Sequence, residues 1–250
     1  MDYKERRTSS NKCVRAPICF LIDRSASMEV IKDNSNKYIK QNQKTYKIEG
    51  QMVNEIIDDQ LYNQTPMGKV SKALKQFYKY ILDDEDAINS CETATIVFDK
   101  EAELWENFSP MQFKRAHSYN IEVNKSATGD NDSNLTVAIE MAIDLANKQK
   151  EFYEQKRLRK HRPVIVLMTD AKTSDETSEI RRRVLQLQEE GKIYFRAVAL
   201  SDDSVDVLSK FSIKPVINAT NIEELIRFIE QLSKSVSVTS DEQERILDDF

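Results

Sequence analysis

Three oxygen-bearing side chains alternate directly after the first apolar segment of the chain. Asp23, Ser25 and Ser27 follow the run Ile18–Ile22, which predicts a buried parallel strand. Open α/β sheets bind ligands beyond the carboxyl ends of their strands, so we expect this trio at a binding edge. One carboxylate with two hydroxyls is a hard donor set that suits Mg²⁺ better than zinc or copper. The same side chains could instead cap the next helix.

A second strand with a carboxylate at its end is predicted much later in the chain. Residues 163–168 form the most apolar run, which ends at Thr169-Asp170. Strands that flank the switch point of a doubly wound sheet are neighbours in space but distant in sequence. We therefore expect Asp23 and Asp170 to face one crevice. The polar loop 127–135 precedes a long helix that is predicted to open at Asn134, and it could reach the same place.

Strands and helices alternate along the remaining chain, which indicates parallel pairing with right-handed crossovers. The predicted fold is α/β: a doubly wound, mostly parallel central sheet with one antiparallel edge strand and helices on both faces. The antiparallel edge is expected at 102–105, after a strand at 93–98. A helix is predicted to begin at Thr65-Pro66, with its buried stripe at Val70, Ala73, Leu74, Phe77 and Ile81. In the long helix the predicted stripe is Val137, Ile139, Met141, Ala142, Leu145 and Ala146.

Composition excludes several function classes. Four glycines in 250 residues leave no glycine-rich phosphate loop, and a net charge of −5 gives no general case for binding nucleic acid. Three cysteines and two histidines make a zinc site improbable. The charged N-terminal segment is not a signal peptide, and no apolar run approaches a membrane span. We therefore expect a cytoplasmic protein that does not act at a membrane.

The chain is predicted to form a single domain over residues 16–237. A polar lead-in covers residues 1–15, and an acidic tail covers residues 238–250. A polar insertion at 29–65 is expected next to the face that carries Asp23. Within it, the spacing of Met52, Val53, Ile56 and Ile57 predicts a short amphipathic helix.

Six segments give the chain a resemblance to a known family. They are FLIDRSASM, TPMGKVSKAL, ATIVFDKEAEL, DSNLTVAIEMA, VIVLMTDAKTSD and the closing stretch 222–237. Together they resemble the von Willebrand factor A proteins that are associated with tellurium resistance and stress in bacteria. The pattern D-x-S-x-S resembles the metal-ion-dependent adhesion site (MIDAS) of such domains.

The resemblance implies a metal site and a way of using it. The implied ligands of Mg²⁺, with Mn²⁺ as the alternative ion, are Asp23, Ser25, Ser27, Ser133 and Asp170. Waters and an Asp or Glu of a partner protein would complete the shell. The implied function is a non-catalytic interaction module in a stress, tellurite-resistance or defence system, with kinase-like or phosphatase-like proteins encoded alongside as partners.

Three features depart from the family pattern. Ser133 replaces a threonine but keeps the oxygen, and Ala171 stands where the family has glycine. Arg24 and Lys172 place cations near the expected ion, where they would weaken metal binding or receive an acidic partner.

Two other functions stay open at this point. A phosphohydrolase of the haloacid-dehalogenase type also begins with a strand that ends in a catalytic aspartate. That chemistry needs a carboxylate two residues later, where this chain has Ser25. The basic segment 148–162 could bind nucleic acid, although cations at a helix end usually form a solvated face. His117 and His161 lack partners at catalytic spacing, which also favours a protein that is not an enzyme.

Overall fold

The structure is a computed structural model. It describes residues 13–29, 62–114, 121, 133–170 and 176–248, and the backbone of short strands between residues 31 and 56. Most of the lead-in, most of the loop 127–135, His117, Ala171 and Lys172 lie outside the described residues.

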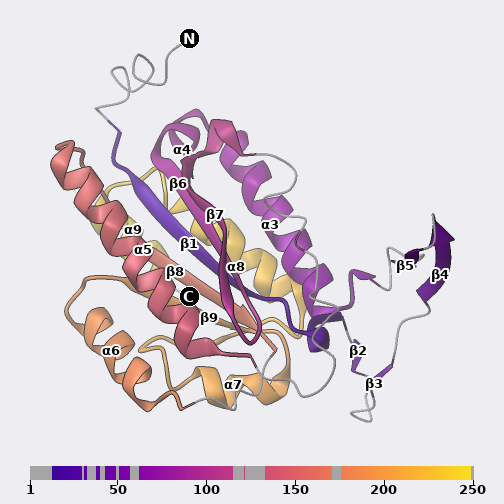
Figure 1. Ribbon diagram of the computed structural model, residues 1–250. Coiled ribbons are helices and arrows are strands. Elements are labelled where there is room, and N and C mark those ends of the chain that lie inside the picture. Colours follow the sequence, from indigo (N-terminus) through magenta and orange to yellow (C-terminus); the bar gives the residue numbers. More distant parts are fainter. Residues whose placement is uncertain are drawn as a thin grey trace.

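A six-stranded sheet runs through the centre of the molecule (Figure 1). Its order is β10-β9-β8-β1-β6-β7. The bounds are β1 Ala16–Asp23, β6 Cys91–Phe98, β7 Ala102–Pro110, β8 Val164–Thr169, β9 Tyr194–Ala199 and β10 Ile217–Asn218. Strand β1 lies between β6 and β8 and is parallel to both, whereas β7 is antiparallel to β6 at the edge. The predicted fold class is therefore confirmed, with an edge strand longer than expected.

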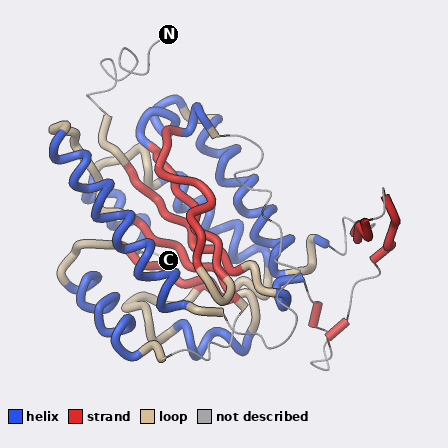
Figure 2. Tube along the Cα trace, in the orientation of Figure 1, coloured by secondary structure: helices blue, strands red, loops and turns tan. Residues whose placement is uncertain are grey.

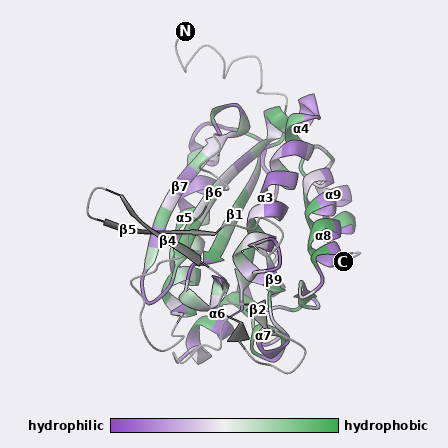
Figure 3. Ribbon diagram, turned by 90° about the vertical axis from the view of Figure 1, so that its right-hand side faces the viewer, coloured by the Kyte–Doolittle hydropathy of each residue, from purple (hydrophilic) through white to green (hydrophobic). Residues whose placement is uncertain are grey.

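Helices cover both faces of this sheet (Figure 2). Their bounds are η1 Ala26–Glu29, α3 Pro66–Leu82, α4 Glu85–Ser90, η2 Met111–Phe113, α5 Leu135–Gln155, α6 Ser178–Glu189, α7 Asp202–Leu208, α8 Ile222–Lys234 and α9 Ser240–Asp248. Ile18, Phe20 and Ile22 of β1 pack in one core with α3, α8 and α9, whereas Cys19 and Leu21 face α5 and α6. This two-sided burial explains why β1 is a continuous apolar run (Figure 3).

Helix α3 begins with the threonine cap and the proline that the sequence predicted. The hydroxyl of Thr65 accepts a hydrogen bond from the Gly68 N–H at 2.9 Å and donates one to the Tyr62 carbonyl at 2.7 Å. Pro66 occupies the first turn, where its missing N–H costs nothing. All five residues of the predicted apolar stripe are fully buried. The predicted helix is confirmed.

The helix predicted around residues 52–57 is wrong. Residues Gln43–Ile48 (β4) and Gln51–Ile56 (β5) pair as an antiparallel ladder, and Ile31–Lys32 (β2) pairs with Tyr38–Ile39 (β3). Four apolar residues within six positions fit a helical period, but so short a run does not exclude a strand. A better signal in the sequence was Gly50, because a glycine between two short segments is typical of a hairpin.

The long helix and the C-terminal tail also differ from what the sequence predicted. Val137 of α5 is 39% exposed, whereas Leu135, Ala138 and Ile143 are buried, so the apolar stripe is rotated relative to the prediction. The acidic tail contains α9, which places Leu247 in the same core as α8. Within the described residues, no helix is both long and apolar enough to cross a membrane.

A substitution at Gly68 tests the close contact at the start of α3. A Cβ at this position would lie 1.8 Å from the carbonyl oxygen of Tyr62. Gly68→Ala should therefore lower the free energy of unfolding by about 1–3 kcal/mol. Ordinary helix propensity predicts a gain of about 1 kcal/mol instead. Urea denaturation measures the difference, with the exposed site Lys72→Ala as control. A Gly68→Ala protein at least as stable as the parent would show that the contact relaxes freely.

Candidate metal centre

The carboxyl ends of β1 and β8 bring two aspartates to the same edge of the sheet. Ile22 pairs with Met168, so Asp23 and Thr169 are the next residues along the neighbouring strands. Asp170 follows immediately. This arrangement is the one expected from the sequence, because parallel neighbours end at one edge.

All five predicted site residues belong to one hydrogen-bonded cluster. The Ser27 hydroxyl donates to Oδ1 of Asp170 at 2.8 Å and lies 3.0 Å from the Ser25 hydroxyl. Ser133 donates to Oδ2 of Asp23 at 2.9 Å, and the Ser25 N–H donates to Oδ1 of the same carboxylate at 2.8 Å. The structure thus assembles groups from three segments that are far apart in sequence. Their role as metal ligands stays a prediction.

Thr169 is a member of the cluster that sequence reasoning missed. Its hydroxyl donates to Oδ2 of Asp23 at 2.5 Å from the end of β8. The available signal was its place beside Asp170 at a strand end, but which way its side chain points depends on the phase of the strand. A further hydroxyl, that of Ser201 after β9, donates to the main-chain carbonyl of Asp170 at 3.1 Å. The first contact holds the carboxylate of Asp23, and the second holds the main chain of Asp170.

Asp23 is a fully buried carboxylate whose negative charge is not balanced by a basic side chain of the described residues. Its exposed fraction is 0%, and no ion pair in the described part of the chain involves it. Burial raises the pKa of Asp23, and the hydrogen bonds from Thr169, Ser25 and Ser133 lower it in part. A buried, unpaired charge is costly, so this site gains from any cation that reaches it.

Arg24 does not face the cluster as a free cation. Its guanidinium contacts Oδ2 of Asp99 at 3.2 Å and Oε2 of Glu103 at 3.1 Å, both in or beside the β6–β7 connection. The β6–β7 hairpin thus supplies two carboxylates that sequence reasoning did not place near Arg24, and the two roles expected for this cation stay predictions.

Asp99 connects the first and second loops of the site. Its carboxylate accepts from Arg24 and from the Glu101 N–H at 3.1 Å, and its carbonyl accepts from the Asn134 N–H at 2.7 Å. Asn134 is the N-cap of α5 and follows Ser133 directly. Asp99 therefore fixes the separation between the loop of Ser25 and the loop of Ser133.

The donor set fits a hard divalent cation. It consists of two carboxylates and several hydroxyls, and two carboxylates balance a double positive charge. In the part of the chain that the structure describes, no group of three or more His, Cys, Asp or Glu side chains could hold a metal ion. Asp170 and Ser27, at 8% and 9%, are the most exposed of the five predicted residues. Among the described residues, no buried polar side-chain atom of this cluster lacks a hydrogen-bond partner.

The pH dependence of stability tests the buried charge of Asp23. With a raised pKa, folded Asp23 keeps its proton at pH values where the unfolded chain has lost it. The folded state then binds more protons, so stability falls as pH rises from the ordinary value of 3.8 through the raised pKa. Asp23→Asn lacks this loss in metal-free buffer. Its stability relative to the parent should therefore increase with pH across that window and then level off. A stability difference that does not vary with pH would contradict a raised pKa.

Comparison with known proteins shows the family of the chain. The family model of the von Willebrand factor type A domain matches residues 62–236, a stretch that begins after β1 and the first loop of the site. No curated protein sequence matches the chain significantly.

Solved structures share the fold at low sequence identity. Proximal thread matrix protein 1 from the mussel byssus, with a zinc-occupied MIDAS motif, is 13% identical with a TM-score of 0.53; the match covers 88% of this chain and 48% of that one. A von Willebrand factor type A protein from Catenulispora acidiphila is 12% identical with a TM-score of 0.56, and the match covers 90% of this chain and 43% of that one. The PilB minor pilin from Streptococcus sanguinis is 12% identical with a TM-score of 0.50, and the match covers 90% of this chain and 62% of that one.

The chain spans about half the length of the mussel structures. The architecture of the sheet agrees with this likeness, which at such identity concerns the fold alone. Since the family model matches more than half of the 250 residues, the chain belongs to the von Willebrand factor type A domain family.

Proposed function

We propose that the protein is a metal-dependent interaction module, in which a bound divalent cation receives a carboxylate from a partner protein. The proposed ligands are Asp23, Ser25, Ser27, Ser133 and Asp170. The observation that carries the proposal is the fully buried Asp23 carboxylate, surrounded by hydroxyls, with no described basic side chain paired to it. The zinc-occupied MIDAS motif of the mussel protein supports the same use of this fold.

The hydrogen bonds leave the serine oxygens able to bind a cation. Ser27 and Ser133 each use their only hydroxyl proton on a carboxylate, and Ser27 accepts the proton of Ser25, so each of the two oxygens keeps a lone pair for a cation. A bound dication would supply a strong electrostatic contact for an incoming carboxylate. The residues of the chain would hold that ion, and the far side of the cluster is kept away from water, since Asp23 and Thr169 are fully buried.

Mg²⁺ is the proposed ion, with Mn²⁺ as the alternative. Carboxylate and hydroxyl oxygens are hard donors. Mg²⁺ commonly keeps several coordination positions that water or a partner's oxygen occupies. Zinc prefers nitrogen and sulfur ligands, which the described cluster does not offer. The zinc bound by the mussel protein means that zinc belongs in any titration.

The proposed setting is a bacterial stress, tellurite-resistance or defence system in the cytoplasm. The support is the resemblance of the sequence segments quoted above, and the proposed partners are kinase-like or phosphatase-like proteins. A partner that presents an exposed Asp or Glu is the chemical requirement. The assignment to one domain over residues 16–237 is likewise a proposal.

A non-catalytic role agrees better with the geometry than the alternatives do. A nucleophilic Asp23 would have to be accessible, whereas this carboxylate is fully buried and accepts three hydrogen bonds. In the basic segment 148–162, Lys160 pairs with Glu154 and Arg162 with Glu244. These ion pairs reduce the charge that the segment could offer to nucleic acid.

Metal titration tests the proposed ion. Mg²⁺, Mn²⁺ and Zn²⁺ are titrated into metal-free protein by calorimetry and thermal unfolding. A metal ion that binds only the folded state should raise the free energy of unfolding by about 2.7 kcal/mol when its free concentration is 100 times its Kd. Asp23→Ala and Asp170→Ala should abolish the effect, whereas Asp144→Ala, on an exposed part of α5, should retain it. Binding that persists in both site variants would refute the assignment.

Asp99 should influence metal affinity without contacting the ion. Asp99→Ala removes its carboxylate contacts with Arg24 and with the Glu101 N–H, so the side-chain part of the connection between the two loops is lost while the main-chain bond to Asn134 remains. We expect metal affinity to fall by about tenfold, as for other groups that orient ligands. Glu103→Ala removes only the exposed partner of Arg24 and is the matched control. Equal metal affinities in the two variants would show that Asp99 does not position the site.

A further inference from the structure

A basic groove lies between α6 and the residues that follow α7, outside the proposed metal site. Its volume is about 430 Å³, and its walls include Ser178, Arg181, Arg182 and Lys210. Leu185 contributes an apolar stretch of the wall. Arginine, lysine and hydroxyl groups along a groove provide a surface for anionic side chains.

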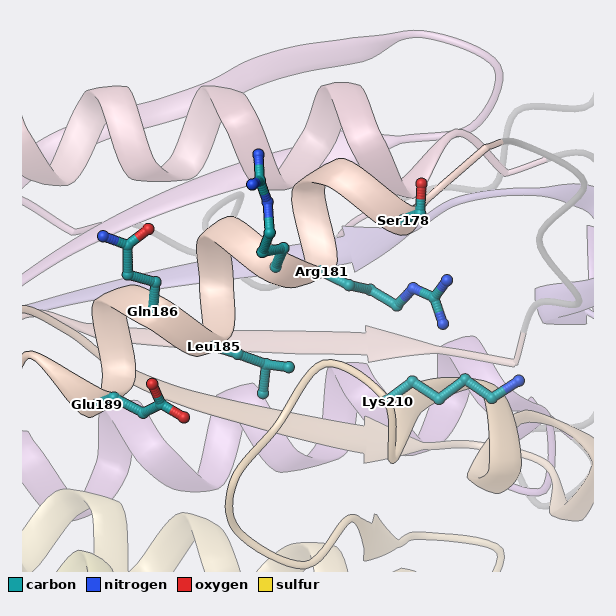
Figure 4. A pocket seen from close by; sticks show the side chains of 7 residues that line it. Ser178, Arg181, Leu185, Gln186, Glu189 and Lys210 are labelled. Atoms are coloured by element: carbon teal, nitrogen blue, oxygen red, sulfur yellow. The ribbon is translucent and has the colours of Figure 1, made fainter.

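The charge of the groove is unevenly distributed. Ser178 and Lys210 lie at the end toward which the strand arrows point, and Gln186 and Glu189 lie at the other end (Figure 4). The side chains of Arg182 and Lys210 form no ion pair or hydrogen bond within the described residues. The neighbouring Arg183, in contrast, pairs with Asp144 of α5 at 3.6 Å. Lys210 at the cationic end and Arg182 elsewhere on the lining therefore offer unpaired charge on a chain whose net charge is −5.

The segments that form the two walls of the groove start from the carboxyl edge of the sheet. The wall formed by α6 begins at Ser178, and just before it the Thr136 hydroxyl of α5 contacts the Glu176 carbonyl at 3.3 Å. Lys210, on the other wall, follows α7, and the N-cap of α7, Ser201, donates its hydroxyl proton to the carbonyl of Asp170. The cationic end of the groove and the proposed metal site thus share the carboxyl edge of the sheet.

We propose that this groove binds an acidic segment of the same partner that gives its carboxylate to the metal. The inference rests on the proposed function, because the metal selects a partner with an exposed Asp or Glu. Further acidic residues of that partner would meet Arg181, Arg182 and Lys210. The complementary charges would distinguish this partner from other proteins that merely expose one carboxylate.

Charge reversal in the groove tests the inference. The probe is fluorescein-labelled octaglutamate in Mg²⁺, with octaglutamine as the uncharged comparison. Arg182→Glu with Lys210→Glu should weaken octaglutamate binding by about tenfold or more, since two attractive contacts become repulsive. Lys72→Glu with Lys79→Glu makes the same charge change on α3, on the opposite face of the sheet, and should have little effect. The Mg²⁺ affinity of both double variants should stay unchanged.

The outcomes separate the groove from the metal. Metal-dependent binding that the groove variant does not weaken would overturn the groove and leave the proposed function standing. Groove-dependent binding that persists in EDTA would keep the groove and count against the metal-dependent function. Absence of octaglutamate binding by the parent protein would overturn the groove. Tighter binding of an eight-nucleotide oligouridylate than of octaglutamate would also overturn it, in favour of a nucleic-acid surface.

Discussion

A buried negative charge at the end of the central strand is the constraint on which this structure depends. Strand β1 has neighbours on both sides and helices on both faces, so Asp23 at its end is removed from water. Ionising a carboxylate there is costly unless donors or a cation surround it. The protein supplies donors from Ser25, Ser133 and Thr169, each from a different segment. These donors reduce the cost but do not cancel the charge, which is why a cation suits this place.

The same constraint explains how the loops around the site are held. The hydroxyls contribute only if their loops stay within hydrogen-bond reach of two carboxylates. Asp99 connects the loop of Arg24 to the start of α5, and Ser201 holds the main chain at Asp170. Arg24 serves this purpose by pairing with carboxylates of the β6–β7 hairpin. Arg24, the positive residue within the D-x-S-x-S pattern, therefore connects two loops in this structure.

The sequence predicted that the two aspartates lie close together, because the ends of strands can be recognised in a sequence. Apolar runs that stop at Asp23 and Asp170 predict a shared edge once the strands are parallel neighbours, and the structure pairs β1 with β8. The partners of Arg24 depend on how β7 folds back on β6, which no local pattern shows. The orientation of Thr169 depends on strand phase. The β4–β5 ladder was mistaken for a helix because a short apolar run satisfies both periods.

A single metal contact provides strength but little choice among partners. Any exposed Asp or Glu that reaches the ion would satisfy it, so discrimination must come from the surface around the site. The basic groove lies between α6 and Lys210, which follows α7, and the N-cap of α7, Ser201, is hydrogen-bonded to the main chain of Asp170. A partner would then be recognised at two points whose separation the sheet sets. Such an arrangement gives the metal the role of anchor and gives the surrounding charges the role of selecting the partner.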